Sequence, residues 1–539
     1  MLTSFVLSVV DARKYVIVAG LLFTLNNAHA AQADLTSANI TEINAALDAG
    51  TLNSEKLVEL YLNRIEAYNK KGPAINAVLL LNPNAIAQAR LLDAERLQKG
   101  RRSPMHGIPV VIKDNFDTAD MPTTAGSYLL KSAYPPDDAF LVKKLRDAGA
   151  IILAKLNMSE FASGDALSSL GGAIGNPHSL TRSPSGSSGG TGAAIAAAFA
   201  AVGLGTDTGG SVRYPSSANG IVGLKTTHGL LSRDGIVPLA LSFDTVGPMA
   251  RSVTDVAIAL GVMTGVDKAD DSTQKSATKY ETDYTQFLDV NALKGARIGV
   301  ARVFMGSDAE VDWVIESALQ SMRDAGAKII DVEFPTWLLE SRGEFYRAIR
   351  YPEFKSQIAE YLATTAAEYP KTLTEIISRA MKLTAENGDG AIPNAYRWSL
   401  MMQEDKSVDL IDYKYTAVRD HALPLVRATI EGLINAEKLD AIVYPTQPRP
   451  AALIETPSIG AVSAGSGESP VILANLSGFP DLILPAGLTA RGLPITISFM
   501  GPAFSEPELI GLGYALEQRL KAIRLPVLTP ALANETINY

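Results

Sequence analysis

The chain has 539 residues, of which 47% are hydrophobic and 19% are charged, a composition that supports a large buried core and excludes extended disorder. The formal net charge is −9 and the basic residues are scattered among more numerous acids, which argues against a nucleic-acid partner. The chain contains no cysteine, so disulfides, thiolate zinc sites and cysteine nucleophiles are all excluded.

The first thirty residues have the features of a secretory signal. Arg13 and Lys14 precede an apolar run over residues 15–25, and Ala28-His29-Ala30 fits a signal-peptidase site. The apolar run is short for a bilayer span, so no stable membrane span is expected after cleavage. An uncleaved N-terminal anchor is the alternative, because the segment before Arg13 is long and apolar. The sequence thus predicts a signal peptide over residues 1–30 and a periplasmic or secreted protein.

The segment that follows alternates between helical and strand patterns. Amphipathic spacing predicts helices over residues 41–49 and 54–68, with Ser54 as the N-cap of the second. A buried strand is expected over 75–82 and a helix over 83–96. The β-branched run Val110-Val111-Ile112 predicts a core strand that ends at Lys113.

Strand–helix–strand order continues from there and indicates an α/β fold. A helix is expected over residues 138–149 and a strand over 151–154, which is typical of a mainly parallel sheet. Residues 157–177 are polar and glycine-rich, and we expect them to form a loop that shapes one wall of a pocket. We predict an Ala-rich helix over 193–201 and a strand over 202–204, which places the segment from Thr206 to Ser211 at a strand end, where α/β proteins hold their chemistry.

The second half of the chain repeats this alternation. Residues 254–263 predict another helix, and residues 267–283 read as a polar linker or surface excursion. Residues 340–435 are largely helical and form an insert that suggests substrate recognition. The remaining expected elements are strands over 297–301, 328–332, 441–444, 482–485 and 494–500, and helices over 311–325 and 506–519.

Glycine and serine are densest over residues 183–213. The motif Gly186-Ser187-Ser188-Gly189-Gly190 opens this stretch, and Asp207-Thr208-Gly209-Gly210-Ser211-Val212-Arg213 closes it. Amide hydrolysis needs a nucleophile, a base, a proton for the leaving amine and donors for the oxyanion. Together with Lys113, these two motifs can supply all four.

The two serine motifs and the Val-Val-Ile-Lys-Asp-Asn segment around Lys113 resemble the amidase signature family, most closely its bacterial peptide amidases. The resemblance covers roughly residues 40–520 and implies one large mixed, mainly parallel twisted sheet covered by helices on both faces. It implies a signature catalytic domain over about 36–525. It also casts Ser211 as nucleophile, Ser187 as a relay serine in a cis peptide bond, and Lys113 as the ultimate base.

The neighbouring residues then take supporting roles. The consecutive N–H groups of Thr208, Gly209, Gly210 and Ser211 can converge on one oxygen, as in the oxyanion hole of the family. A lysine is a cation at neutral pH, and its burial at the end of an apolar strand lowers its pKa enough to act as a base. Asp207 and Arg213 either support the nucleophile turn or form a purely local ion pair. Ser188 is expected to hydrogen-bond within its loop.

Other chemistries fit less well. Gly186 to Gly190 also matches the nucleophile elbow of α/β-hydrolases, which would make Ser188 the nucleophile of an esterase, but neither downstream histidine, His228 or His421, has an acid–histidine setting. No phosphate loop, metal motif or cofactor motif is present, so neither a metal nor a cofactor is expected. Within the family, the amidase subunit of the glutamyl-tRNA amidotransferase is the alternative function, against which the signal peptide argues.

A dead amidase scaffold that only binds is a further alternative, but Lys113, Ser187 and Ser211 are all retained. The sequence therefore predicts a serine amidohydrolase that cleaves a small-molecule or peptide carboxamide through an acyl-enzyme. Peptide C-terminal amides are the preferred substrates. Neither the residues that line the pocket nor the oligomeric state follows from the sequence.

Overall fold

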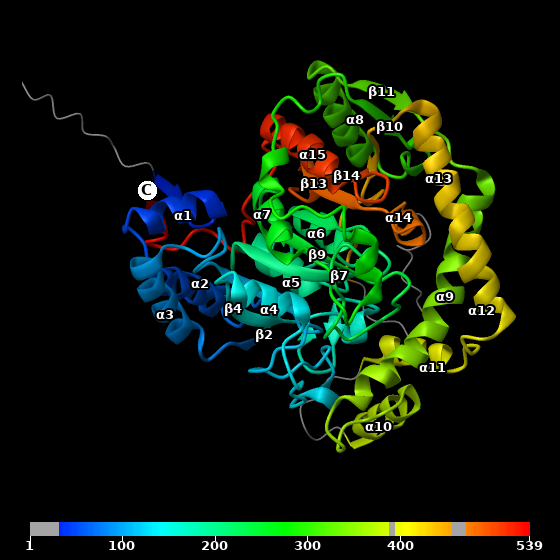
Figure 1. Cartoon of the computed structure of the whole chain (residues 1–539), viewed down its shortest axis with the longest axis horizontal. Helices are drawn as coiled ribbons and strands as arrows, with labels where there is room; N and C mark the ends of the chain where they lie inside the picture. Colours follow the sequence, from blue (N-terminus) through cyan, green and yellow to red (C-terminus); the bar gives the residue numbers. More distant parts are fainter. Residues whose placement is uncertain (1–31, 387–393, 455–469) are drawn as a thin grey trace, which may run out of the picture. The chain divides into compact units, whose positions relative to one another are not determined.

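The computed structural model describes residues 32–386, 394–454 and 470–539 (Figure 1). The predicted signal peptide, residues 1–30, lies outside them. Residues Gln32–Tyr539 form one compact unit. No helix within the described ranges is both long enough and apolar enough to cross a membrane.

The described residues build an 11-stranded sheet in the order β11-β10-β12-β14-β13-β8-β9-β7-β3-β4-β2. In chain order its strands are β2 (Val78–Leu81), β3 (Pro109–Lys113), β4 (Ile151–Leu156), β7 (Val202–Asp207), β8 (Val222–Lys225), β9 (Thr245–Ala250), β10 (Arg297–Val300), β11 (Lys328–Asp331), β12 (Ala441–Pro445), β13 (Asp481–Leu488) and β14 (Pro494–Met500). Short pairs lie outside this sheet: β1 (Gln32–Asp34) with β15 (Thr536–Asn538), and β5 (Leu167–Ser168) with β6 (Gly172–Ala173).

The predicted mixed α/β sheet is confirmed, but among the described residues it is not mainly parallel, because six of its ten strand pairings are antiparallel. β7, β3 and β4 are parallel to one another, as are β11, β10 and β12. Between these two groups, β14, β13, β8 and β9 join the sheet by antiparallel pairing. The strand–helix–strand pattern of residues 109–156 therefore holds locally and does not extend across the centre of the sheet.

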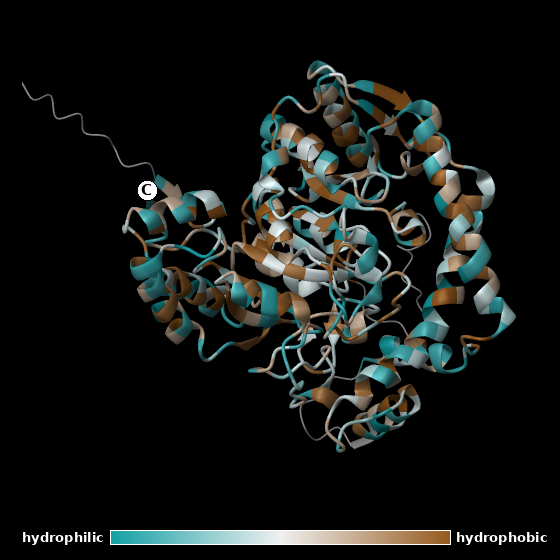
Figure 2. Cartoon of the chain, viewed as in Figure 1, coloured by the Kyte–Doolittle hydropathy of each residue, from teal (hydrophilic) through white to brown (hydrophobic). Residues whose placement is uncertain are grey.

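Helices cover the sheet in two sets. α5 (Gly189–Ala196) and α6 (Arg213–Asn219) contact each other and the central strands, whereas α4 (Phe140–Asp147), α7 (Val253–Met263), α8 (Ala309–Asp324) and α15 (Glu506–Leu520) are linked by contacts among themselves. The N-terminal helices are α1 (Ile40–Asp48), α2 (Ser54–Tyr68) and α3 (Ala85–Lys99). Figure 2 shows brown and white residues in the central strands, and brown mixed with teal on the outer helices.

The predicted helical insert corresponds to a run of helices after β11. These are α9 (Thr336–Ala363), α10 (Leu373–Glu386), α11 (Ala395–Asp405), α12 (Tyr413–Ala417) and α13 (Leu423–Glu437), and α14 (Ile472–Ser477) follows β12. Figure 1 shows α9 and α13 running along the side of the molecule that carries α14. The insert thus lies beside the sheet and contributes residues to the site described below.

Three local predictions need correction. The N-cap of α2 is Asn53, whose side chain accepts the N–H of Lys56, so Ser54 is the first helical residue. The Ala-rich helix begins at Gly189 rather than at residue 193 and ends at Ala196. β7 continues to Asp207 because Thr206 and Asp207 still pair with β9.

Candidate active site

Lys113 is the last residue of β3, a strand whose five residues are all buried. Its Nζ donates hydrogen bonds to Ser187 Oγ at 2.8 Å and to Thr206 Oγ1 at 2.7 Å. Burial lowers the pKa of Lys113 to about 7, even though the carboxylates of Asp244 and Asp207 favour its protonated form. A large fraction of this lysine is therefore a neutral amine at physiological pH.

Ser187 lies in the loop between residues 183 and 188, and the Gly186–Ser187 peptide bond is cis. Its carbonyl accepts the N–H of Ser159 at 3.0 Å, so the loop over residues 157–177 braces it. A Cβ on Gly186 would lie 2.3 Å from Ser159 Oγ, which explains why glycine occupies this position. The predicted loop beside the site is thus in direct contact with Ser187.

Ser211 stands in the turn between β7 and α6 and is partly exposed, whereas Lys113 and Ser187 are buried. Its carbonyl accepts the N–H of Ser188 at 3.2 Å, which fastens the two serine motifs together. Ser188 Oγ donates to the Thr206 carbonyl of β7 at 3.3 Å, and not within its own loop as predicted. The structure therefore brings all three predicted catalytic residues to one end of β3 and β7.

The carboxylate of Asp207 organises the turn that carries Ser211. Its oxygens accept the N–H groups of Gly210 at 2.8 Å and Val212 at 3.0 Å. Burial by itself would raise the pKa of Asp207, but the ion pair with Arg213 and hydrogen bonds from Arg213 and Asn475 hold it well below its usual range. Asp207 is therefore a permanent anion that accepts backbone donors.

Arg213 extends this network across the sheet. It pairs with Asp207 at 3.0 Å and with Asp481 at 2.9 Å, and it also donates to Asn475 Oδ1 and to the Val471 carbonyl. The sequence left open whether Asp207 and Arg213 form only a local ion pair. In the structure the pair is fully buried and joins the serine turn to β13 and α14.

The predicted oxyanion donors, Thr208, Gly209, Gly210 and Ser211, are arranged around this turn, and Gly210 has φ +112. The N–H of Gly210 is directed at Asp207, as described above, so it is not aimed freely at a substrate. Thr208 Oγ1 donates to Asp244, which also accepts the N–H groups of Leu239 and Ala240. The turn is thus held from both sides by carboxylates.

Several residues near the site were missed by sequence reasoning. Tyr346 of α9 stacks on Phe243 with ring centroids 5.6 Å apart, and a Cβ on Gly209 would lie 2.6 Å from its hydroxyl oxygen. Thr206 and Asn115 adjoin Lys113; both lie inside segments that the sequence had singled out, but no role was assigned to either. Tyr346 and Asn475 come from distant segments and carry no sequence signal of their own.

Comparison with known proteins gives a consistent result. The chain matches the Amidase family over residues 56–510. It is 33% identical over 491 residues to a subunit of the glutamyl-tRNA(Gln) amidotransferase from Caldanaerobacter subterraneus subsp. tengcongensis, covering 90% of this chain and 97% of that protein. It is 34% identical to a probable amidase of Arabidopsis thaliana, covering 90% of each.

Solved structures agree with these sequence matches. The native peptide amidase of Stenotrophomonas maltophilia superposes with a TM-score of 0.82 at 37% identity, covering 92% of this chain and 99% of that one. The peptide amidase in complex with the competitive inhibitor chymostatin gives a TM-score of 0.83 at 37% identity, covering 91% and 99%. The chain therefore belongs to the amidase signature family and is an amidase, a hydrolase of carboxamide bonds.

Proposed function

We propose that the protein is a serine amidohydrolase that works through an acyl-enzyme on Ser211. The observation that carries the proposal is the 2.8 Å hydrogen bond between the buried amine of Lys113 and Ser187 Oγ. The next residue, Ser188, donates its N–H to the carbonyl of Ser211, which joins this pair to the turn of the proposed nucleophile. With its pKa near 7, Lys113 is able to accept a proton at physiological pH.

The proposed reaction begins with Ser211 Oγ attacking the carboxamide carbon. Its proton passes to Ser187 Oγ as the proton of Ser187 passes to Lys113 Nζ. The oxyanion accepts the N–H groups of Thr208, Gly209 and Ser211, because the N–H of Gly210 already donates to Asp207. Return of the proton along the same path to the leaving nitrogen breaks the C–N bond and releases ammonia or an amine, and water then cleaves the acyl-enzyme by the same sequence.

Peptide C-terminal amides are the proposed substrates. Support comes from the two peptide amidase structures, which match over nearly their whole length at 37% identity. Ser211 is partly exposed, and Tyr346 packs against its turn at Gly209, so the nucleophile is open to solvent next to an aromatic side chain. No nucleic acid or cofactor takes part in this proposal.

The decisive experiment is ammonia release from a panel of peptide C-terminal amides, aryl amides, aliphatic amides and a long-chain amide, with Ser211→Ala and Lys113→Ala alongside. We expect turnover of peptide amides, and each substitution should abolish it. Turnover that survives Ser211→Ala would reject the acyl-enzyme on this serine. Turnover only of another amide class would reject the peptide substrate while keeping the mechanism.

An amidotransferase-type protein is the second candidate, because curated relatives at 33–36% identity carry that name. Such a protein would release ammonia from glutamine for a partner. Glutamine hydrolysis that requires addition of a partner, with no turnover of peptide amides by the isolated chain, would favour it.

The proposed location is periplasmic or extracellular, after removal of residues 1–30. Expression of the full chain in a bacterial host followed by mass measurement of the N-terminus tests this proposal. We expect a mature chain that begins near Ala31 in the periplasmic fraction. A full-length chain in the membrane fraction would indicate an anchor instead.

A further inference from the structure

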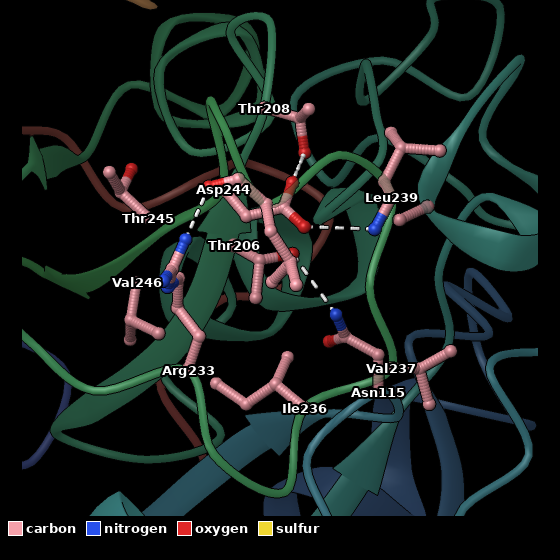
Figure 3. Close-up of a pocket in the computed structure, with 12 residues that line it drawn as sticks. Asn115, Thr206, Thr208, Arg233, Ile236, Val237, Leu239, Asp244, Thr245 and Val246 are labelled. Carbon is pink, nitrogen blue, oxygen red and sulfur yellow. Dashed lines mark hydrogen bonds between the residues drawn. The ribbon is translucent and has the colours of Figure 1, made fainter. Parts of the chain in front are cut away.

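A small pocket lies next to Thr206, the residue that accepts a hydrogen bond from Lys113. Its cavity volume is about 10 Å³, which is room for about one water molecule, and Thr206, Asn115 and Asp244 form its polar side. Figure 3 shows the amide of Asn115 directed at Thr206, with the apolar side chains of Ile236 and Val237 beside it. Thr206 thus contacts Lys113 Nζ and also borders the pocket.

Asn115 is the polar group that the protein leaves unsatisfied there. Its side chain is 1% exposed, and its Nδ2 donates to Thr206 Oγ1 at 3.2 Å. Its Oδ1 is fully buried and has no hydrogen-bond partner among the described residues. Figure 3 shows this oxygen directed into the pocket, and a buried carbonyl in such a position requires a donor.

The hydroxyl of Thr206 has one O–H donor that can point into the same pocket. A hydroxyl offers two lone pairs and one O–H donor. Its Oγ1 accepts from Lys113 at 2.7 Å and from Asn115 at 3.2 Å, which occupies both lone pairs. The O–H is therefore left to donate elsewhere, and a ligand in the pocket that accepts from Thr206 and donates to Asn115 would satisfy both groups.

The charged groups around the pocket are compensated by the protein, which argues for a neutral ligand. Asp244 accepts from Thr208 Oγ1, Leu239 N and Ala240 N. Arg233 donates to Asp270 at 2.7 Å and to the Leu241 carbonyl. A small neutral molecule with both donors and acceptors fits these surroundings, and buried polar sites of this kind bind water.

We propose that the pocket is a water-binding site and that Asn115 is a positioning residue, which acts through this water and Thr206 to aim the amine of Lys113 at Ser187. A neutral amine has a single lone pair. When the water accepts the Thr206 O–H, Thr206 can only accept from Lys113, so the lone pair remains available for the Ser187 proton. Without the water, the Thr206 O–H can donate to that lone pair and compete with Ser187.

This inference rests on the proposed function, but its first test does not. A crystal structure that shows ordered waters should contain one within about 3.2 Å of both Asn115 Oδ1 and Thr206 Oγ1. A pocket without water, or an Asn115 oxygen bonded to a protein donor, overturns the proposal. This result stands even if Ser211→Ala retains activity, which would overturn the proposed function instead.

Kinetics of Asn115→Leu provide the second test. This substitution keeps most of the side-chain volume and removes both amide groups. We expect kcat to fall roughly 3- to 10-fold, the effect of losing one neutral hydrogen bond, with little change in KM. The loss should persist at high pH, because the amine is misdirected rather than protonated, and the solvent isotope effect on kcat should increase.

The matched control is Asn82→Leu. Asn82 is a buried asparagine that follows β2 and donates to the Ile152 carbonyl, away from the pocket. The Asn82→Leu variant measures how much activity falls when any buried side-chain amide is removed, and its solvent isotope effect on kcat should be unchanged. Full recovery of Asn115→Leu at high pH, or an equal isotope effect in both variants, contradicts the positioning role. As an internal check, Thr206→Ser should retain activity that Thr206→Val loses.

Discussion

Among single residues, Lys113 is the one that determines how activity depends on pH in the proposed mechanism. Its pKa is lowered to about 7 by burial, and only the neutral amine can accept a proton. We therefore predict that kcat/KM rises with pH and levels off above a midpoint near 7. Lys113→Arg, which cannot deprotonate, should lower kcat by at least about 100-fold.

The pH–rate profile of Glu517→Gln provides the control for this assignment. Burial also raises the pKa of Glu517 to about 7, but its carboxylate accepts the N–H of Val253 rather than a group of the site. The rising limb should be unchanged in Glu517→Gln. A limb that moves with Glu517, or a rate that is flat between pH 6 and 8 in the parent enzyme, would contradict the assignment to Lys113.

The same burial imposes a cost on stability. The pKa of Lys113 is lower in the folded chain than in the unfolded chain, so the unfolded state binds more protons between about pH 7 and 10. The contribution of this residue to the free energy of unfolding is therefore most favourable above about pH 10, and it is lost progressively as the pH falls from about 10 to about 7. We predict that Lys113→Met raises the free energy of unfolding by about 1 to 3 kcal/mol at pH 7.

Urea unfolding at several pH values measures this effect. The stability difference between Lys113→Met and the parent should shrink as the pH rises towards 10, because the unfolded parent chain then also loses its proton from this lysine. Using the difference cancels the contribution of Lys225, another buried lysine whose pKa is lowered to about 7. A difference independent of pH would mean that packing, not proton binding, decides the stability.

At this scale the sequence predicts the reactive groups better than their surroundings. Lys113 and Ser187 could be paired in advance because their short motifs resemble those of the amidase signature family, and the structure places Lys113 Nζ 2.8 Å from Ser187 Oγ. Asn475 and Tyr346 could not be predicted, because they reach the turn of Ser211 only through the tertiary fold and each is an ordinary residue in a helical pattern.

Among the elements, α5 is held closest to its neighbours. A Cβ on Gly190 would lie 2.1 Å from the Asn157 carbonyl oxygen and 2.8 Å from that of Ala77. Both obstacles are backbone atoms and cannot rotate away. We predict that Gly190→Ala shifts α5 and abolishes most activity, together with a marked loss of thermal stability.

Gly432 of α13 is the matched position, because a Cβ there would meet nothing within 4 Å. Gly432→Ala should stabilise the protein by up to about 1 kcal/mol, since alanine is the better helix former. The midpoint of thermal unfolding and the rate of ammonia release should be measured for both variants. The comparison separates the gain from helix propensity at Gly432 from the steric clash with backbone atoms at Gly190. Equal tolerance at both positions would show that α5 has room to move.

This close approach also explains why the boundaries of α5 were wrong. The sequence suggested a glycine loop before residue 193, whereas Gly189 and Gly190 are the first residues of the helix. Glycine normally weakens a helix, but here it lets the helix pack directly against the Asn157 carbonyl. Local propensity cannot reveal a neighbour that the fold supplies from another segment.

For the whole molecule, the class of fold could be predicted and its strand directions only in part. Alternating strand and helix patterns around Lys113 indicated parallel pairing, which holds for β7, β3 and β4. β8 and β9 were not identified, because glycines and a proline interrupt their apolar pattern. Their antiparallel pairing to β7 and β13 depends on contacts far apart in sequence.

The C-terminal segment packs on α2, where Arg64 binds it. This buried guanidinium pairs with Glu535 at 2.7 Å, and it donates to the carbonyls of Thr529 and Ala197 at 2.9 Å each. β15 pairs with β1 beside it. The C-terminal segment therefore compensates the buried charge of Arg64, which also donates to Ala197 at the end of α5, the helix that follows the loop of Ser187.

Removal of residues 529–539 should consequently destabilise the protein by about 3 to 5 kcal/mol, the usual effect of leaving one member of a buried ion pair unpaired. Arg64→Met within the shortened chain removes the uncompensated charge, so it should recover part of that loss. Urea unfolding of the parent, the truncation and the combined variant measures both effects. If Arg64→Met only adds to the loss, then packing of the C-terminal segment, rather than charge compensation, is what holds the ends of the chain on the catalytic unit.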